Sequence, residues 1–230
     1  GFANYYRFAA AEAAGPAHAS RAISWVVAGG VVAAFAGPQL GVWGRDWLPP
    51  HAFLGSYLAQ ALLSLSAMVL LSRLALRPMV VAAGEPARTL REIVAQPALR
   101  AAVAGAAVGY AVMIMAMTAT PLAMLGCGFG TGEIKPVIQW HVFAMFAPSF
   151  VTGSLVERFG APRIMQAGFL LLIVHVLIAA SGLEYLHFLS ALVLLGVGWN
   201  FAFVGGTALL TQSYRASEQT KVQALNEGLV

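Results

Sequence analysis

Charged side chains fall inside apolar stretches of this 230-residue chain. Arg7 and Glu12 lie in the first stretch, with Arg7 about two helical turns before the next polar connection. Ionisable groups inside membrane helices are costly and are usually functional. Arg7 is therefore a candidate for binding an anionic substrate group or for coupling to a proton carrier. The alternative is an arginine that reaches the membrane surface and pairs with Glu12, although residues five apart do not share a helix face well.

Two further groups are candidates for the same chemistry. His141 lies just inside one end of a later apolar stretch, and histidine can carry a proton near neutral pH. More often, a lone histidine in a membrane helix is simply a hydrogen-bonded structural residue. Tyr110 shares a helix face with Met113 and Met117, which suits either a solute or ordinary packing.

The composition places these residues in a membrane protein. Of all residues, 60% are hydrophobic and 10% are charged, whereas soluble domains carry about 25% charged residues. The apolar runs are long and do not alternate, so we expect an all-α integral membrane fold. The net charge of +4 comes from basic residues between the runs, which indicates membrane topology rather than nucleic-acid binding.

Other chemistry lacks its sequence signature. Cys127 is the only cysteine, which argues against a disulfide within the chain and against a metal cage. The sequence has no phosphate-binding loop, zinc-protease motif or nucleophile elbow. We therefore expect no metal, no cofactor and no enzymatic activity.

The apolar runs predict six full membrane spans and two partial ones. The full spans are expected at Ser24–Val42, Phe53–Leu71, Ala101–Leu125, Val137–Val156, Ile164–Ser181 and Phe188–Thr211. The partial spans are expected at Gly1–Ala14 and Val222–Val230.

The basic residues give an orientation for these spans. Odd-numbered connections carry ten Lys and Arg residues and even-numbered ones carry two. Cytoplasmic loops are enriched in Lys and Arg. We therefore expect a protein of the bacterial inner membrane whose cytoplasmic loops are 15–23, 73–100, 157–163 and 212–221. The long basic segment 73–100 contains the helical pattern ARTLREIVAQPALR and looks like a linker between two bundles.

Two short stretches of the sequence resemble each other, which supports a protein built from two similar halves. GFANYYRFAAAEAA at the start and GWNFAFVGGTALL from Gly198 each carry a glycine, aromatic residues and an asparagine. The asparagines, Asn4 and Asn200, are further candidates for substrate binding or coupling. Internal repeats are common in transporters.

The stretch GSLVERFGAPR resembles the cytoplasmic loop signature of the major facilitator superfamily. The matching residues are Gly153, Leu155, Glu157, Arg158, Gly160 and Arg163. The family usually has Asp where this chain has Glu157, and Ala161 replaces a basic residue. With 73–100 as the linker, this stretch falls between the second and third spans of the later half, as it does in that family.

A second stretch, AGGVVAAFAGPQLG, resembles the Gly-Pro motif of the fifth helix of the same family. The matching residues are Gly37, Pro38 and Gly41, while Ala33 replaces a further glycine. The resemblance implies a two-bundle fold running from the end of helix four to the start of helix eleven. It assigns 1–76 to the N-terminal bundle (end of helix four, helices five and six), 77–100 to a cytoplasmic linker, and 101–230 to the C-terminal bundle (helices seven to ten and the start of helix eleven).

The resemblance also implies roles for particular residues. Arg7, Glu12, Trp199 and Asn200 would lie on cavity-lining helices. Glu157 is expected to contact the start of the Ser24 helix near Arg21 and hold the cytoplasmic side closed, although it could act only as a topology signal. The Gly37-Pro38 stretch would be a pivot or a seal, or an ordinary proline kink.

These observations predict secondary active transport of a small solute by alternating access, with proton coupling and a monomer in the lipid bilayer. One alternative is a membrane-embedded enzyme that uses His141, His175 or Glu12. Another is a membrane sensor or scaffold that interacts through 73–100. The substrate does not follow from the residues.

Overall fold

The computed structural model describes residues 5–73 and 88–229, and their regular elements are all helical. The candidate Asn4 and residues 74–87 of the predicted linker lie outside the described part. The α-helices are α1 (Tyr6–Ala14), α2 (Ala19–Ala28), α3 (Gly30–Trp43), α4 (Leu54–Ser72), α5 (Leu90–Ala95), α6 (Pro97–Gly126), α7 (Thr131–Phe146), α8 (Ser149–Phe159), α9 (Ala161–Ser181), α10 (Tyr185–Thr211) and α11 (Gln219–Leu229). Two short 3₁₀ turns are η2 (Gly44–Asp46) and η3 (Ala216–Glu218).

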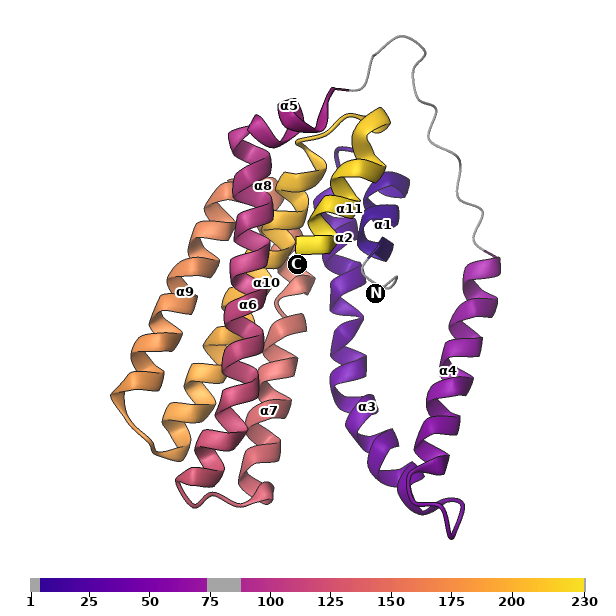
Figure 1. The fold of residues 1–230 in the computed structure, drawn as a ribbon, viewed down its shortest axis with the longest axis vertical. Coiled ribbons are helices and arrows are strands. Elements are labelled where there is room, and N and C mark those ends of the chain that lie inside the picture. The colour runs from indigo at the N-terminus through magenta and orange to yellow at the C-terminus, as the bar shows by residue number, and fades with distance from the viewer. Residues whose placement is uncertain (1–4, 74–87, 230) are drawn as a thin grey trace. The chain divides into compact units, whose positions relative to one another are not determined.

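The described helices form two compact units. The first contains α1, α2 and α5 to α11, and the second contains α3, η2 and α4. In the first unit, α5, α1 and α11 gather at the same end (Figure 1). The predicted boundaries at 76 and 100 between two bundles stay a prediction.

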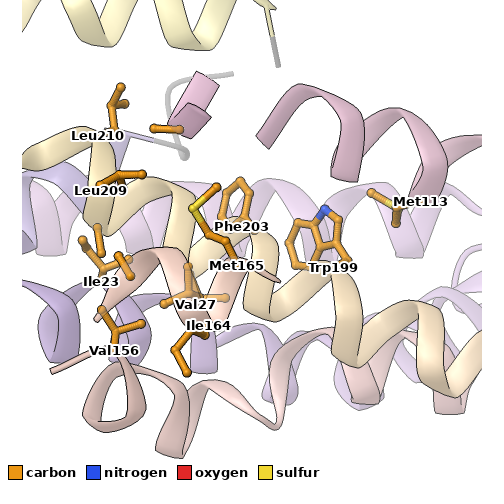
Figure 2. Packing of buried hydrophobic residues seen from close by; sticks show 14 of the residues in the cluster. Ile23, Val27, Met113, Val156, Ile164, Met165, Trp199, Phe203, Leu209 and Leu210 are labelled. Atoms are coloured by element: carbon orange, nitrogen blue, oxygen red, sulfur yellow. The ribbon is translucent and has the colours of Figure 1, made fainter. Parts of the chain in front are cut away.

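Helix α10 is the centre of the first unit. It packs against α6, α7, α8, α9 and α2, and most of its residues are buried. Small residues allow this close packing: a Cβ atom at Gly168 of α9 would lie only 2.7 Å from the Gly198 carbonyl oxygen of α10. Figure 2 shows part of the resulting core, with Trp199 between Phe203 and Met113.

Five described helical stretches are long and apolar enough to cross a membrane, and the first of them comprises α2, α3 and η2. They are Ala19–Asp46, Leu54–Ser72, Pro97–Gly126, Ala161–Ser181 and Tyr185–Thr211. Each overlaps a predicted span, which agrees with a multi-pass helical membrane protein. The predicted count of six full and two partial spans is not confirmed.

The missing span is the one expected at Val137–Val156. In the structure this segment is divided into α7 and α8 at Ala147 and Pro148. Proline has no backbone N–H and disfavours a helical conformation in the residue before it, so it commonly ends a helix. Neither piece alone reaches the length of a membrane span.

Several predicted loops are shorter than expected. The stretch GSLVERFGAPR is mostly helical, because α8 continues to Phe159 and α9 begins at Ala161. Only Gly160 is non-helical, with φ of +86°, which permits the abrupt change of direction. Likewise α2 begins at Ala19 inside the predicted 15–23 loop, and α11 begins at Gln219 inside 212–221.

The helical pattern predicted before Arg100 is confirmed as α5 and the start of α6. Thr89 caps α5: its hydroxyl accepts from the Glu92 backbone N–H, while Glu92 Oε2 accepts from the Thr89 backbone N–H at 2.7 Å. This reciprocal arrangement satisfies two donors at the start of the helix.

Candidate functional site

A cavity of about 290 Å³ lies within the first unit, between α1, α2, α6, α7 and α10. Its walls are largely aromatic and aliphatic, with one charged residue. The lining residues are Arg7, Val26, Val27, Tyr110, Met113, Met145, Phe146, Trp199 and Phe203. Clefts of this size that are mostly apolar and carry a few polar groups are typical small-molecule sites.

Arg7 is the charged residue of this cavity and is only 3% exposed. Its Nη2 lies 2.5 Å from Oε1 of Glu227 in α11. The guanidinium carbon also lies 4.6 Å from the ring centre of Phe8 and 4.5 Å from that of Phe203. Arg7 therefore pairs with Glu227 and not with Glu12, and its charge is compensated inside the protein.

The aromatic wall is built mainly by α10. The rings of Trp199 and Phe203 stack with centres 4.6 Å apart and planes 15° from parallel. Residues four apart lie on one helix face, so this spacing brings the rings together. Phe146 of α7 meets Trp199 edge-on at 6.1 Å. Tyr110, on the face predicted from the sequence, completes the wall from α6.

Two buried N–H groups of the cavity residues have no hydrogen-bond partner among the described residues. They are Nε of Arg7 and Nε1 of Trp199. Both are donors without any acceptor capacity. Buried polar groups are nearly always paired, so an unpaired donor in a cavity wall needs an explanation.

Other predicted candidates lie outside the cavity lining. Asn200 is fully buried, accepts from the Thr152 hydroxyl at 2.8 Å, and donates to the Met145 carbonyl and the Ser149 hydroxyl at 2.7 and 2.6 Å. This network joins α10 to α7 and α8 and uses both ends of the amide. The geometry of Asn200 is therefore that of a helix-packing residue.

The histidines and Glu12 also make structural contacts. Nδ1 of His141 lies 2.8 Å from the Leu192 carbonyl oxygen, and Nδ1 of His175 lies 2.8 Å from that of Ala191. Glu12 accepts a hydrogen bond from the Gln219 side chain. Among the described residues, no group of three or more His, Cys, Asp or Glu could hold a metal ion.

A second polar contact lies where α2 begins and α8 ends. Nε of Arg21 is 2.7 Å from Oε2 of Glu157. Gly153 makes the approach possible, because a Cβ atom there would lie 2.7 Å from both Arg21 Cα and the Ser20 carbonyl oxygen. The contact expected for Glu157 is thus present, while its role stays a prediction.

The remaining signature residues surround this contact. Leu155 packs against the buried core, and the Arg158 guanidinium lies 5.2 Å from the ring centre of Phe159. Arg163 is exposed in the first turn of α9.

The Gly-Pro motif belongs to the second unit. Pro38 lies inside α3 without ending that helix. Ser56 of α4 donates to the Gly41 carbonyl at 2.8 Å, while a Cβ atom at Gly37 or Gly41 would meet no described atom within 4 Å. The predicted role of the Gly37-Pro38 stretch, as a pivot or as a seal, stays a prediction.

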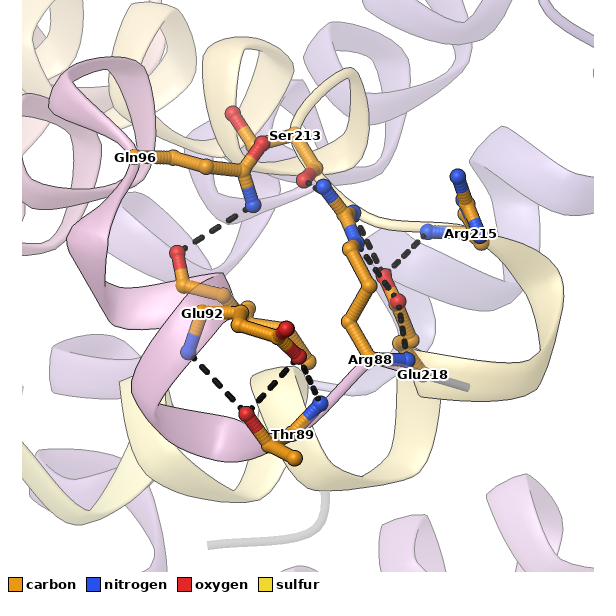
Figure 3. Close-up of polar contacts among 8 residues, drawn as sticks. Arg88, Thr89, Glu92, Gln96, Ser213, Arg215 and Glu218 are labelled. Carbon is orange, nitrogen blue, oxygen red and sulfur yellow. Dashed lines mark hydrogen bonds and ion pairs between the residues drawn. The ribbon is translucent and has the colours of Figure 1, made fainter. Parts of the chain in front are cut away.

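A polar cluster missed from the sequence joins α5 to the connection between α10 and α11 (Figure 3). Glu218 is completely buried and accepts from Nε and Nη2 of Arg88, both at 2.7 Å, and from the backbone N–H groups of Arg88 and Arg215. The Arg88 hydrogen bonds hold the pKa of Glu218 at about 2, well below its ordinary 4.5.

Glu227 and Phe203, which both contact Arg7, were not candidates from the sequence. Glu227 lies near the end of α11, and an acidic residue near a helix end is too common in sequences to indicate a buried ion pair. Phe203 has only the spacing of four from Trp199 as a signal.

The fold and the cavity define a class of protein: a multi-pass helical membrane protein with a largely apolar cavity between helices of its first unit. The family model of the Major Facilitator Superfamily matches residues 6–229. The chain belongs to that superfamily.

Curated relatives carry transporter names. The chain is 44% identical over 225 residues to "Riboflavin transporter RfnT" of Brucella anthropi, covering 96% of this chain and 56% of that protein. Two Bacillus subtilis proteins, "Uncharacterized MFS-type transporter" YdeG and YddS, are 39% identical over 121 residues and 41% identical over 128 residues. They are matched over 28% and 29% of their own lengths. This chain thus spans about half or less of these relatives, and solved structures give no significant match.

Proposed function

We infer that this chain is part of a secondary active transporter that moves a small solute by alternating access, and that riboflavin or a close chemical relative is the solute. The observation that carries this inference is the Arg7, Trp199 and Phe203 cavity in a chain 44% identical to a named riboflavin transporter. An aromatic cavity offers a planar solute large contact areas at small cost in conformational entropy.

Alternating access needs contacts that form on one side of the solute and break when the protein reopens. The Arg21–Glu157 pair has suitable chemistry, because both side chains lie near water and can separate at low cost. In this proposal the pair belongs to the cytoplasmic side and is formed when the cavity faces outward. Proton coupling and a monomeric state are part of the same proposal.

The test uses the full-length protein reconstituted into liposomes, with uptake of radiolabelled riboflavin measured with and without an imposed pH gradient. Saturable uptake that a protonophore abolishes is expected. Uptake no greater than in empty liposomes, in both orientations of the gradient, contradicts the proposed substrate. Uptake that ignores the gradient contradicts proton coupling alone.

The enzyme and scaffold alternatives predict different behaviour. A scaffold that acts through 73–100 would not respond to Arg7→Ala, whereas a transporter with this cavity would lose uptake. An enzyme would convert the solute, so chromatography of the liposome contents separates it from a transporter that delivers unchanged riboflavin.

A further inference from the structure

A second cavity of about 420 Å³ lies in the first unit, further along the same helices. On α10 the first cavity is lined by Phe203 and the second by Thr211. On α2 the first is lined by Val26 and the second by Ala19. Because a helix rises 1.5 Å per residue, these offsets place the second cavity about 10 to 12 Å further along both helices. It lies at the end of the unit where α1 and α11 gather (Figure 1).

Adjacent residues of α1 line the two cavities, Arg7 the first and Phe8 the second. The guanidinium carbon of Arg7 lies 4.6 Å from the ring centre of Phe8 and 4.5 Å from that of Phe203. All three residues are buried. Phe8, Arg7 and Phe203 therefore form a closed layer at the level between the two cavities, which we call the Arg7 layer.

Glu227 of α11 holds the Arg7 layer in place. Its Oε1 lies 2.5 Å from Nη2 of Arg7, and the two side chains are only 12% and 4% exposed. An arginine stays charged in proteins, whereas a carboxylate can take up a proton. Protonation of Glu227 removes the counter-charge of Arg7, and a buried charge without its partner is strongly destabilising. The contact between α1 and α11 then has to rearrange.

The other acidic residues of the elements beside Glu227 are less suited to this role. Glu218 of η3 has its pKa held at about 2 by the Arg88 hydrogen bonds, so it stays ionised. Glu12 of α1 is exposed and accepts a hydrogen bond from Gln219. The remaining charged or titratable groups on the described parts of α1, α6, η3, α11 and their flanks are not carboxylates. They are Tyr5, Arg100, Tyr110, Tyr214, Arg215 and Lys221.

We propose that the Arg7 layer is a gate between the two cavities, and that a proton taken up by Glu227 opens it. The proton binds a carboxylate oxygen of Glu227 and replaces its ion pair with Arg7 by a contact with an uncharged carboxyl group. It is released when the pair forms again, so one proton is taken up and given off per opening. The inference rests on the transport function proposed above and assigns the proton coupling of that function to Glu227.

The first measurement needs no solute. Spin labels at the exposed Ala13 of α1 and Ala224 of α11 are placed in the full-length protein with its cysteines replaced. Double electron–electron resonance then gives the distance between the two helices at a series of pH values. Lowering the pH is expected to populate longer distances in the wild-type protein, because a proton shifts the equilibrium towards the state that binds it better.

Glu227→Gln is expected to show the longer distances at every pH. Glu184→Gln removes an exposed carboxylate elsewhere and should behave as the wild type does. Glu227→Asp keeps a carboxylate on a shorter side chain, so its pH dependence should persist with a different midpoint, even if Glu227→Gln fails to fold. Distances that ignore pH in the wild type, or the same pH dependence in folded Glu227→Gln or Glu227→Asp as in the wild type, overturn the proposal.

The second measurement compares accumulation with exchange in liposomes. One coupled proton supports about tenfold accumulation of riboflavin per unit of pH gradient, since a pH unit is worth 1.36 kcal/mol. Folded Glu227→Gln is expected to lose this accumulation but to exchange labelled for unlabelled riboflavin without a gradient, whereas Glu184→Gln keeps both. Retained accumulation overturns the proposal, and so does loss of exchange together with accumulation, which would make Glu227 a packing residue.

The two measurements separate this inference from the proposed substrate. If the wild-type protein neither accumulates nor exchanges riboflavin, the proposed substrate is wrong. The distances between the labels on α1 and α11 still decide whether Glu227 controls the Arg7 layer, because they are measured without any solute.

Discussion

Nε of Arg21 lies 2.7 Å from Oε2 of Glu157, which joins the first turn of α2 to the last turn of α8. The arginine side chain is 52% exposed and the glutamate 22%. Such a pair contributes little to stability, about 0.2 to 1 kcal/mol when exposed. A contribution of this size suits the proposed latch, a contact that would form and break in each transport cycle.

Glu157→Gln is expected to shift the conformational equilibrium away from the state in which α2 and α8 are paired. Distances between spin labels on these two helices, measured by double electron–electron resonance, report the shift. In a double-mutant cycle, Arg21→Gln and Glu157→Gln should show a coupling energy of about 0.5 to 1 kcal/mol. Arg158→Gln is the neighbouring control, and an unchanged distance distribution in Glu157→Gln would rule out the latch.

Gly153→Ala is expected to force α2 and α8 apart, because the new Cβ would lie 2.7 Å from Arg21 Cα. Overpacking of this kind costs about 1 to 3 kcal/mol. Gly132→Ala is the control, since a Cβ at that helical position meets no described atom within 4 Å. Equal thermal unfolding midpoints for the two variants would show that the close approach at Gly153 is unimportant.

The Glu218 contact predicts a pH dependence. The folded-state pKa of Glu218 is lowered to about 2 from 4.5, mainly by the Arg88 hydrogen bonds. Its contribution to stability is therefore fully present above pH 4.5 and is lost as the pH falls from 4.5 towards 2.

Glu218→Gln removes this contribution at neutral pH, where breaking a buried ion pair costs about 3 to 5 kcal/mol. The difference in unfolding midpoint between wild type and Glu218→Gln should be large at pH 7 and shrink below pH 4.5. The exposed Glu184→Gln serves as a control. A difference that stays constant down to pH 3 would contradict the ion-pair explanation.

Asn200→Ala separates a packing role from a binding role. It removes the contacts with Thr152, Met145 and Ser149 and leaves buried groups unsatisfied, at a cost of about 1 to 3 kcal/mol each. We expect a lower unfolding midpoint with an unchanged Kd for riboflavin. A raised Kd at an unchanged midpoint would instead make Asn200 a substrate ligand.

Labelling of Cys127 tests the predicted orientation of the helices across the membrane. It is exposed in the connection between α6 and α7, which the distribution of basic residues assigns to the outer side. In the full-length protein with any other cysteines replaced, a membrane-impermeant maleimide should label Cys127 in intact cells. Labelling that requires broken cells would reverse the topology.

The membrane spans could be predicted because each one is a continuous run of apolar residues, which is visible in the sequence without knowledge of tertiary contacts. Leu54–Ser72 and Ala161–Ser181 differ from the predicted Phe53–Leu71 and Ile164–Ser181 by at most three residues at either end. The division at Pro148 was missed because apolar composition continues through it.

The site was predictable only in part. Arg7, Trp199 and Tyr110 were candidates because a charge or an aromatic residue in an apolar helix is a local signal, and all three line the cavity, while their part in binding stays a prediction. Asn200 gave the same signal yet binds neighbouring helices. Glu227 was missed because its partner lies 220 positions away, and such pairing is decided by tertiary packing.

The pairing of Arg7 with Glu227 has a consequence for how the protein is made. Ribosomes synthesise Arg7 220 residues before Glu227, so α1 exists before its counter-charge does. A buried arginine that lacks its partner is strongly destabilising. The buried position of Arg7 can therefore be completed only after α11 has been made, late in the synthesis of this part of the protein.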